Sequence, residues 1–193
     1  MIDTTYITEF SERMLHALEW KRFEILCCEF INMAGYKAKE TSYGADGGID
    51  IVVKDSKDSV QAIIQCKAWN TYTVGIKHIR ELYGIMMKEN VKTGVFITTS
   101  KYTKEAQEFA EETKIQLVNG AKFVEVVNRL PKDKLKRLID MTFEGDYSTP
   151  TCPKCGVKMV LRNTEKPFWG CANFGRTRCQ HKFFIKRADV VEE

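Results

Sequence analysis

The sequence lacks the features that mark a membrane or secreted protein. No run of about 18 apolar residues occurs, so no transmembrane helix is expected. The N-terminal residues MIDTTYITEFSERM are polar and acidic, which is not the pattern of a signal peptide. The chain has seven cysteines. Without a sign of secretion, we expect them to be reduced thiols in a cytoplasmic protein, not a disulfide framework.

Internal repeats and low-complexity tracts are absent, as is any Ser-His-Asp set or nucleophilic cysteine arrangement. The length of 193 residues allows one domain of ordinary size with a small appendage.

Positive charge is unevenly distributed. From residue 151 onward there are nine Lys and Arg against four Asp and Glu, a net charge of +5. The whole chain carries +4, which leaves −1 for the first 150 residues. The C-terminal segment is therefore the better candidate for non-specific phosphate binding, although a basic soluble surface would look the same.

Hydrophobic periodicity predicts an α/β fold in which helices flank a mixed central β-sheet. Gly35 is a suitable stop for the first helix, and Thr103 a suitable cap for a later one. The expected helices cover 8–34, 76–89, 104–113, 121–129 and 132–142. The expected strands cover 36–43, 49–54, 60–66, 95–99 and 115–118.

The segment GADGGID, at 44–50, begins a pair of expected strands that ends in QCK, at 65–67. Glycines 44, 47 and 48 predict a tight turn before Asp50. Because strand residues alternate between faces, Gln65 and Lys67 project to one side and Cys66 to the other. Antiparallel pairing would bring a carboxylate, an amide oxygen and an ammonium together, a set that suits a hard metal ion and a phosphate.

Phosphodiester hydrolysis gives each of these side chains a role. Asp50 would anchor Mg²⁺, and Gln65 would add its carbonyl oxygen. Because an amide is a weaker ligand than a carboxylate, a further acid is desirable, and Glu24 on the first helix is the candidate. Lys67 would orient the attacking water and counter the charge on phosphate.

Simpler readings of these residues remain open. An aspartate after glycines is more often a turn residue than a ligand, and a QxK triplet also occurs by chance. Asp46 can close the turn and stays outside the set. Glu19 and Glu29 are alternatives to Glu24, because the helical register is a guess.

The ordered set resembles the Mrr-like nucleases of the PD-(D/E)XK superfamily, in the branch whose last motif is QxK. The resemblance covers roughly residues 18–130 and implies a restriction-endonuclease-like fold. It also implies a catalytic set of Asp50, Gln65, Lys67 and Glu24, with Mg²⁺ or Mn²⁺ held by Asp50, Gln65 and Glu24. The segments that carry the resemblance are Phe23-Glu24, Gly35-Tyr36, GADGGID, QCK, Val74-Gly75, Glu81-Leu82-Tyr83-Gly84, Val95 to Ser100, Thr103 to Ala106 and Ile115 to Gly120.

Four cysteines in the last fifth of the chain have the spacing of a zinc site: C-x2-C, fifteen residues, then C-x7-C. We predict that Cys152, Cys155, Cys171 and Cys179 bind Zn²⁺. A segment of about forty residues cannot build a large core, so bound zinc would supply much of its folding free energy. His181 is a further potential ligand, although four cysteines suffice.

The tail also resembles the C4 zinc finger of bacterial type IA topoisomerases, through CPKCG, Met159-x-x-Arg162, FWGC and Asn173-Phe174. The resemblance implies DNA binding, including single strands. Cations interleaved with aromatics suit phosphates and stacked bases, although some aromatics would simply cover the zinc ribbon. The predicted DNA-binding residues are Lys158, Arg162, Phe168, Trp169, Phe174, Arg176 and Arg178.

Together these patterns predict a metal-dependent DNA endonuclease of a restriction or defence system, with double-stranded DNA, including modified DNA, as substrate. The expected organisation is a nuclease domain at 1–142, a linker at 143–151, a zinc finger at 152–187 and a tail at 188–193. Cutting both strands with one site per chain favours a homodimer. Two alternatives stay open: a junction-resolvase-like repair nuclease and a non-catalytic DNA-binding module.

Overall fold

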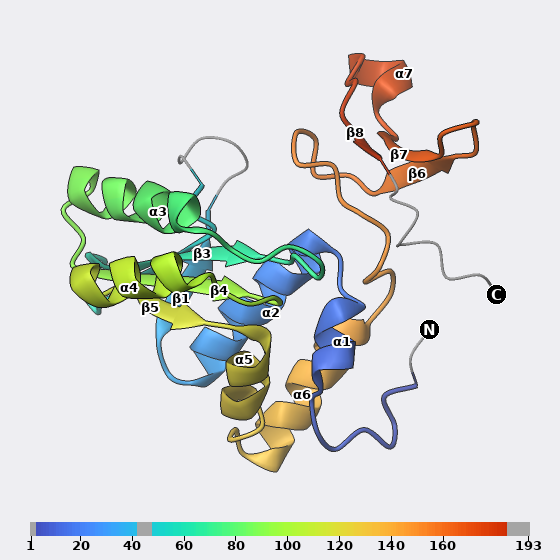
Figure 1. Cartoon of the computed structure of the whole chain (residues 1–193). Helices are drawn as coiled ribbons and strands as arrows, with labels where there is room; N and C mark the ends of the chain where they lie inside the picture. Colours follow the sequence, from blue (N-terminus) through green and yellow to red (C-terminus); the bar gives the residue numbers. More distant parts are fainter. Residues whose placement is uncertain (1–2, 42–47, 185–193) are drawn as a thin grey trace. The chain divides into compact units, whose positions relative to one another are not determined.

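A five-stranded mixed sheet forms the centre of the first part of the chain in the computed structural model (Figure 1). Its order is β1 (Lys37–Glu40), β2 (Ile51–Lys54), β3 (Val60–Lys67), β4 (Thr93–Thr98) and β5 (Gln116–Val118). β1, β2 and β3 are antiparallel, whereas β3, β4 and β5 are parallel. The predicted mixed α/β fold is confirmed.

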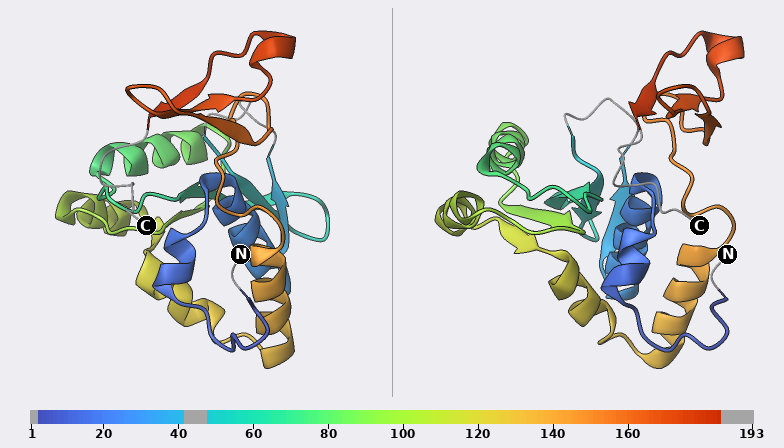
Figure 2. Two further views of the ribbon diagram at one scale, coloured as in Figure 1. Left: turned by 90° about the vertical axis from the view of Figure 1, so that its right-hand side faces the viewer. Right: turned by 45° about the vertical axis from the view of Figure 1, so that its right-hand side comes forward.

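Helices cover both faces of this sheet (Figure 2). Ile64 and Cys66 of β3 belong to the core formed with α1 (Glu12–His16), α2 (Trp20–Met33), α5 (Gly120–Val127) and α6 (Lys132–Phe143). Ile63 belongs to the opposite core, formed with α3 (Ile76–Lys88) and α4 (Lys104–Thr113). Each buried Leu, Ile or Phe side chain contributes roughly 1.5–3 kcal/mol. Both faces of β3 are thus buried, which fixes its register.

The single helix expected at 8–34 is instead two helices, α1 and α2, with a break at 17–19. Glu19 is the N-cap of α2, and its carboxylate accepts hydrogen bonds from the backbone N–H groups of Lys21 (3.0 Å) and Arg22 (3.2 Å). Glutamate is not a preferred N-cap residue, so the sequence carries no strong signal for the start of α2. The apolar periodicity continues across the break and predicts one helix. The expected stop is confirmed: α2 ends at Met33, and Gly35 has φ +97°.

The C-terminal part contains a three-stranded antiparallel sheet of β6 (Met159–Arg162), β7 (Phe168–Cys171) and β8 (Lys182–Phe184). α7 (Phe174–Thr177) lies between β7 and β8 in the chain. The small core consists of the cysteines with Met159, partly covered by Trp169 and Phe183.

The structure describes residues 3–41 and 48–184. Gly44, Asp46 and Gly47 of the predicted turn, and the predicted tail at 188–193, lie outside these residues. The chain divides into two compact units, Met1–Ser148 and Thr149–Glu193, and this division falls within the linker expected at 143–151. Across 3–41 and 48–184, no helix has the length and apolar character to cross a membrane.

Candidate active site and cysteine cluster

Asp50 lies directly before β2 and is fixed on both sides by the neighbouring strands. Its N–H donates to the carbonyl of Ile64 (3.0 Å), and its own carbonyl accepts from the N–H of Thr41 (3.0 Å). Its carboxylate Oδ2 accepts from the N–H of Cys66 at 2.6 Å. Burial raises the pKa of Asp50, and the Cys66 N–H and the Lys67 charge partly oppose that rise. The carboxylate therefore lies at the end of β3 that carries QCK.

Gln65 is buried, and its Oε1 has no hydrogen-bond partner among the residues that the structure describes. A buried acceptor left without a partner costs about 1–3 kcal/mol, so this oxygen is a candidate to bind a ligand. Gly48, with φ +103°, packs against the same amide: a Cβ there would lie 3.0 Å from Gln65 Nε2. The close approach of Gly48 holds the amide in place.

Lys67 is the last residue of β3 and is half-buried. Its carbonyl accepts three hydrogen bonds, from the N–H of Trp69 (3.0 Å), the N–H of Thr99 (3.2 Å) and the hydroxyl of Thr98 (2.8 Å). This backbone anchor fixes the start of the Lys67 side chain. Cys66 faces the core around α2, so Gln65 and Lys67 project from the opposite face, as alternation predicts.

Glu24 is buried on α2 and is the acid of this helix that meets Asp50. Burial and the Asp50 charge raise its pKa to about 8, and the two carboxyl groups share a hydrogen bond. The alternatives are placed elsewhere: Glu19 caps α2, and Glu29 is only half-buried. The structure thus places Glu24 against Asp50, and Asp50 at the end of β3 that carries Gln65 and Lys67.

Two further charged residues of this region were not found by sequence reasoning. Lys21 Nζ lies 3.0 Å from Glu24 Oε2 and 2.6 Å from Glu40 Oε2. Burial opposes the charge of Lys21, but its bonds to both carboxylates outweigh this and raise its pKa. A signal was available for Lys21, which precedes Glu24 by three residues on a helix and so lies on the same face.

The charges of the cluster account for these shifts together. Glu24, Glu40 and Asp50 are three carboxylates, and Lys21 and Lys67 are two ammonium groups. Full ionisation would leave an excess negative charge in a buried place, which is unfavourable. The raised pKa values of Glu24 and Asp50 reduce that excess, because they favour the neutral, protonated form of each carboxyl group.

In the second unit, the Sγ atoms of Cys152, Cys155, Cys171 and Cys179 all lie within 4.8 Å of one another. Burial raises the pKa of Cys171 to about 12. A hydrogen bond from the backbone N–H of His181 lowers the pKa of Cys179 to about 7. Four convergent thiols match the donor set of tetrahedral Zn²⁺, which binds thiolates at about 2.3 Å. The residues therefore fit a zinc ion, and His181 is not a member of the cluster.

The residues predicted to bind DNA are distributed over different surfaces of this unit. Arg162 and Phe168 are opposite each other on β6 and β7. Trp169 packs against the cysteine core, and the Lys158 ammonium donates to the Thr149 carbonyl at 2.8 Å. Phe174, Arg176 and Arg178 are exposed on or beside α7.

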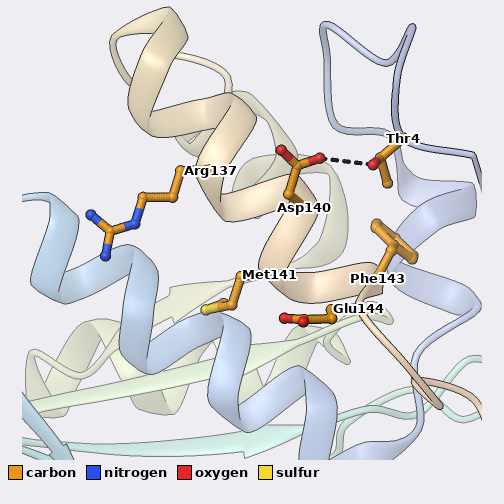
Figure 3. Close-up of a pocket in the computed structure, with 6 residues that line it drawn as sticks. All are labelled: Thr4, Arg137, Asp140, Met141, Phe143 and Glu144. Atoms are coloured by element: carbon orange, nitrogen blue, oxygen red, sulfur yellow. Dashed lines mark hydrogen bonds between the residues drawn. The ribbon is translucent and has the colours of Figure 1, made fainter.

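A separate surface hollow occurs beside α6 (Figure 3). Its lining comes from α6 and the N-terminal segment, where the Thr4 hydroxyl donates to Asp140 Oδ1 at 2.7 Å. None of the predicted catalytic residues lines it; the lining residues are Thr4, Arg137, Asp140, Met141, Phe143 and Glu144. The candidate active site is therefore the carboxylate cluster and not this hollow.

Comparisons with known proteins concern the first unit. The profile of a family described as Mrr_cat, restriction endonuclease, matches residues 15–127. The type IV methyl-directed restriction enzyme EcoKMrr of Escherichia coli (strain K12) is 32% identical over 113 residues. That alignment covers 55% of this chain and 37% of EcoKMrr, so the chain spans little more than a third of its relative.

Solved structures show weaker similarity. The MspJI restriction endonuclease in complex with a 27-mer oligonucleotide has a TM-score of 0.44 and 19% identity, covering 69% of this chain and 34% of that chain. The DNA modification-dependent restriction endonuclease AspBHI has a TM-score of 0.49 and 15% identity, covering 74% and 43%.

Proposed function

The chain belongs to the Mrr_cat restriction endonuclease family, and from that premise we propose that it is a divalent-metal-dependent DNA endonuclease. The proposed reaction is hydrolysis of phosphodiester bonds in cytoplasmic restriction of foreign DNA, including modified DNA. The observation that carries the proposal is the buried Gln65 Oε1, which has no hydrogen-bond partner within 3–41 and 48–184 and lies at the strand end where Asp50 and Lys67 meet.

The donor set of this centre suits Mg²⁺ or Mn²⁺. Asp50 is bonded to the Cys66 N–H through Oδ2, which orients the carboxylate. Gln65 would contribute Oε1, and Glu24 a second carboxylate. These are oxygen donors, which hard cations prefer. When bound, the ion supplies Lewis-acid polarisation of a phosphoryl oxygen.

The other contributions come from the side chains of the chain itself. Asp50 and Gln65 would hold the scissile phosphate region in register through the cation. Lys67, on an anchored backbone, would orient the attacking water and stabilise negative charge that develops on the phosphate. Attack of the water oxygen on phosphorus would form the new P–O bond as the bond to the leaving oxygen breaks. The water would lose a proton to solvent, and the leaving oxygen would take one from solvent.

The zinc-binding unit would hold DNA through the outer face of its sheet. Opposite partners in antiparallel strands share a face, so Arg162, Phe168 and Phe184 form one row. The rings of Phe168 and Phe184 lie 6.2 Å apart, and the Lys182 ammonium lies 4.8 Å above Phe168. The exposed Phe184 ring and the half-buried Phe168 ring, beside cations, are suited to stacked bases and phosphates of single strands.

Gly170 leaves room for this surface. A Cβ on Gly170 would lie 3.2 Å from Phe168 Cε2 and 3.6 Å from Arg162 Cγ, so glycine lets both side chains lie across β7. Trp169, on the opposite face, covers the cysteine core. We therefore propose Arg162 and Phe168 as the DNA contacts among the predicted residues, with Phe184 and Lys182 added.

The test compares cleavage of modified, unmodified, single-stranded and branched DNA by the wild type and Asp50→Ala, with Mg²⁺ or Mn²⁺. Cleavage of linear double-stranded DNA by the wild type alone is expected, and sedimentation on DNA should detect a homodimer. Preference for branched DNA would favour the junction-resolvase alternative. No cleavage of any DNA, with unchanged function of Asp50→Ala in cells, would instead favour a non-catalytic module.

A further inference from the structure

Lys21 joins two carboxylates beside the candidate metal site. Its ammonium lies 3.0 Å from Glu24 Oε2 and 2.6 Å from Glu40 Oε2, and its side chain is 13% exposed. The three residues come from two elements: Lys21 and Glu24 from α2, and Glu40 from the end of β1. Such a buried ion triad requires that each charge be balanced by its neighbours.

We propose that Lys21 is a positioning residue that takes the place of a second divalent ion, so that the centre holds one ion per chain. The inference rests on the proposed metal-dependent nuclease function. It concerns how many ions the carboxylates hold, which that function leaves open.

Geometry supports the exclusion of a second ion. Two-metal centres place their ions about 3.5–4 Å apart and share carboxylates between them. Beyond Asp50, the described residues that offer carboxylates beside Lys21 are Glu24 and Glu40, and both hold its ammonium. Mg²⁺ binds oxygen at about 2.0–2.1 Å, so an ion bonded to these two carboxylate oxygens would compete with the ammonium that they already hold.

The backbone fixes Lys21 and Glu40 in this arrangement. The Lys21 N–H is bonded to the Glu19 carboxylate in the first turn of α2. Glu40 pairs with Ile51 in the sheet, next to Asp50. Both side chains therefore start from rigid positions on either side of Glu24, which favours a site prepared before metal arrives.

Charge leads to the same conclusion. Lys21 neutralises one of three nearby carboxylates. Replacing it by methionine, which is similar in length and uncharged, would remove the cation that pairs with Glu24 and Glu40 and leave Lys67 as the cation beside Asp50 among the described residues. That excess negative charge would attract a second divalent ion into the space that the ammonium vacates.

The experiment counts ions directly. Zinc-loaded full-length protein is titrated with Mn²⁺, and free Mn²⁺ is measured by electron paramagnetic resonance. The wild type is expected to bind one Mn²⁺ per chain, and Lys21→Met two. Lys21→Arg, which keeps the charge, should bind one. Lys21→Met/Glu40→Gln should also return to one, because the second ion loses a ligand.

Two sites in the wild type, or a Lys21→Met protein that does not gain a site, would overturn the role of Lys21. Where Lys21→Met fails to fold, the wild-type count still tests the proposal, because two sites in the wild type would overturn it. Asp50→Asn separates the two proposals. One site in both wild type and Lys21→Met, lost in Asp50→Asn, leaves the proposed function intact, whereas a wild type that binds no Mn²⁺ contradicts that function itself.

Discussion

Replacing Glu24 with glutamine should stabilise the protein at alkaline pH when no divalent ion is added. In the folded chain, burial and the Asp50 charge raise the pKa of Glu24 to about 8 from its ordinary value of 4.5. Between these values the folded state keeps a proton that the unfolded chain has lost. The free energy of unfolding must then fall as pH rises through this window.

The size of the effect follows from the same shift. Each pH unit in the window lowers the free energy of unfolding by about 1.4 kcal/mol for a fully coupled group. The upper limit of this loss in the free energy of unfolding is about 5 kcal/mol over the window, and sharing of the proton with Asp50 reduces it. The opposing effect of the Lys21 ion pair is already contained in the pKa of about 8. Glutamine cannot ionise, so Glu24→Gln removes this dependence and should exceed the wild type by a few kcal/mol at pH 8.

The measurement is urea unfolding at pH 5, 6.5 and 8, followed by helical circular dichroism. This signal reports the first unit, because the second contains among its described residues only the four-residue helix α7. Zinc is present in the buffer at every pH. Glu29→Gln, on the same helix but outside the cluster, is the matched control and should follow the wild type.

Comparing variant with wild type cancels the titration of the shared groups that do not interact with Glu24; Asp50 does interact with it and contributes to the difference. The difference in stability between Glu24→Gln and the wild type should therefore increase from pH 5 to pH 8. A difference that is constant or decreases with pH would refute the argument that Glu24 is protonated in the metal-free centre.

Three other substitutions test the remaining features. Gly48→Ala should lower the free energy of unfolding by about 1 kcal/mol, because the φ of this residue is unfavourable for alanine. It should also lower Mn²⁺ affinity and cleavage, because the new Cβ would displace Gln65. Gly84→Ala, where a Cβ meets nothing within 4 Å, should bind Mn²⁺ normally in the same titration. Cys171→Ser should abolish zinc binding and unfold the second unit, while helical circular dichroism of the first persists; loss of both would mean that the units do not fold independently. Phe168→Ala should weaken single-stranded DNA binding by about 1–3 kcal/mol in a fluorescence titration; equal weakening by Leu161→Ala, on the opposite face, would exclude a role specific to the outer face.

Local chemistry made much of the fold predictable. The consecutive apolar residues Ile51 to Val53 and Ile63-Ile64 are typical of strands buried on both faces. Thr103 accepts the cap hydrogen bond from the Ala106 N–H at 3.3 Å as predicted. The break between α1 and α2 was missed because apolar periodicity continues across it. Its cap is a glutamate, whose longer side chain carries no strong signal for a helix start.

For the candidate site, the sequence supplied Asp50, Gln65 and Lys67, because two strands with fixed register must place them together. The acid on α2 was a choice among three glutamates. Only packing of α2 against the sheet selects Glu24, which contacts Asp50, and leaves Glu19 to cap the helix. Glu40 could not be assigned, since its partner Lys21 is far away in sequence.

The sequence by itself therefore determined most elements of the first unit, the strand pair that carries the polar triplet and the four cysteines with metal spacing, because each depends on residues close together in the chain. Only the tertiary structure decided which glutamate meets Asp50, that Lys21 bridges Glu24 and Glu40, and which finger residues share a face. These depend on how helices and strands pack, and burial there changes the charge of every acid involved.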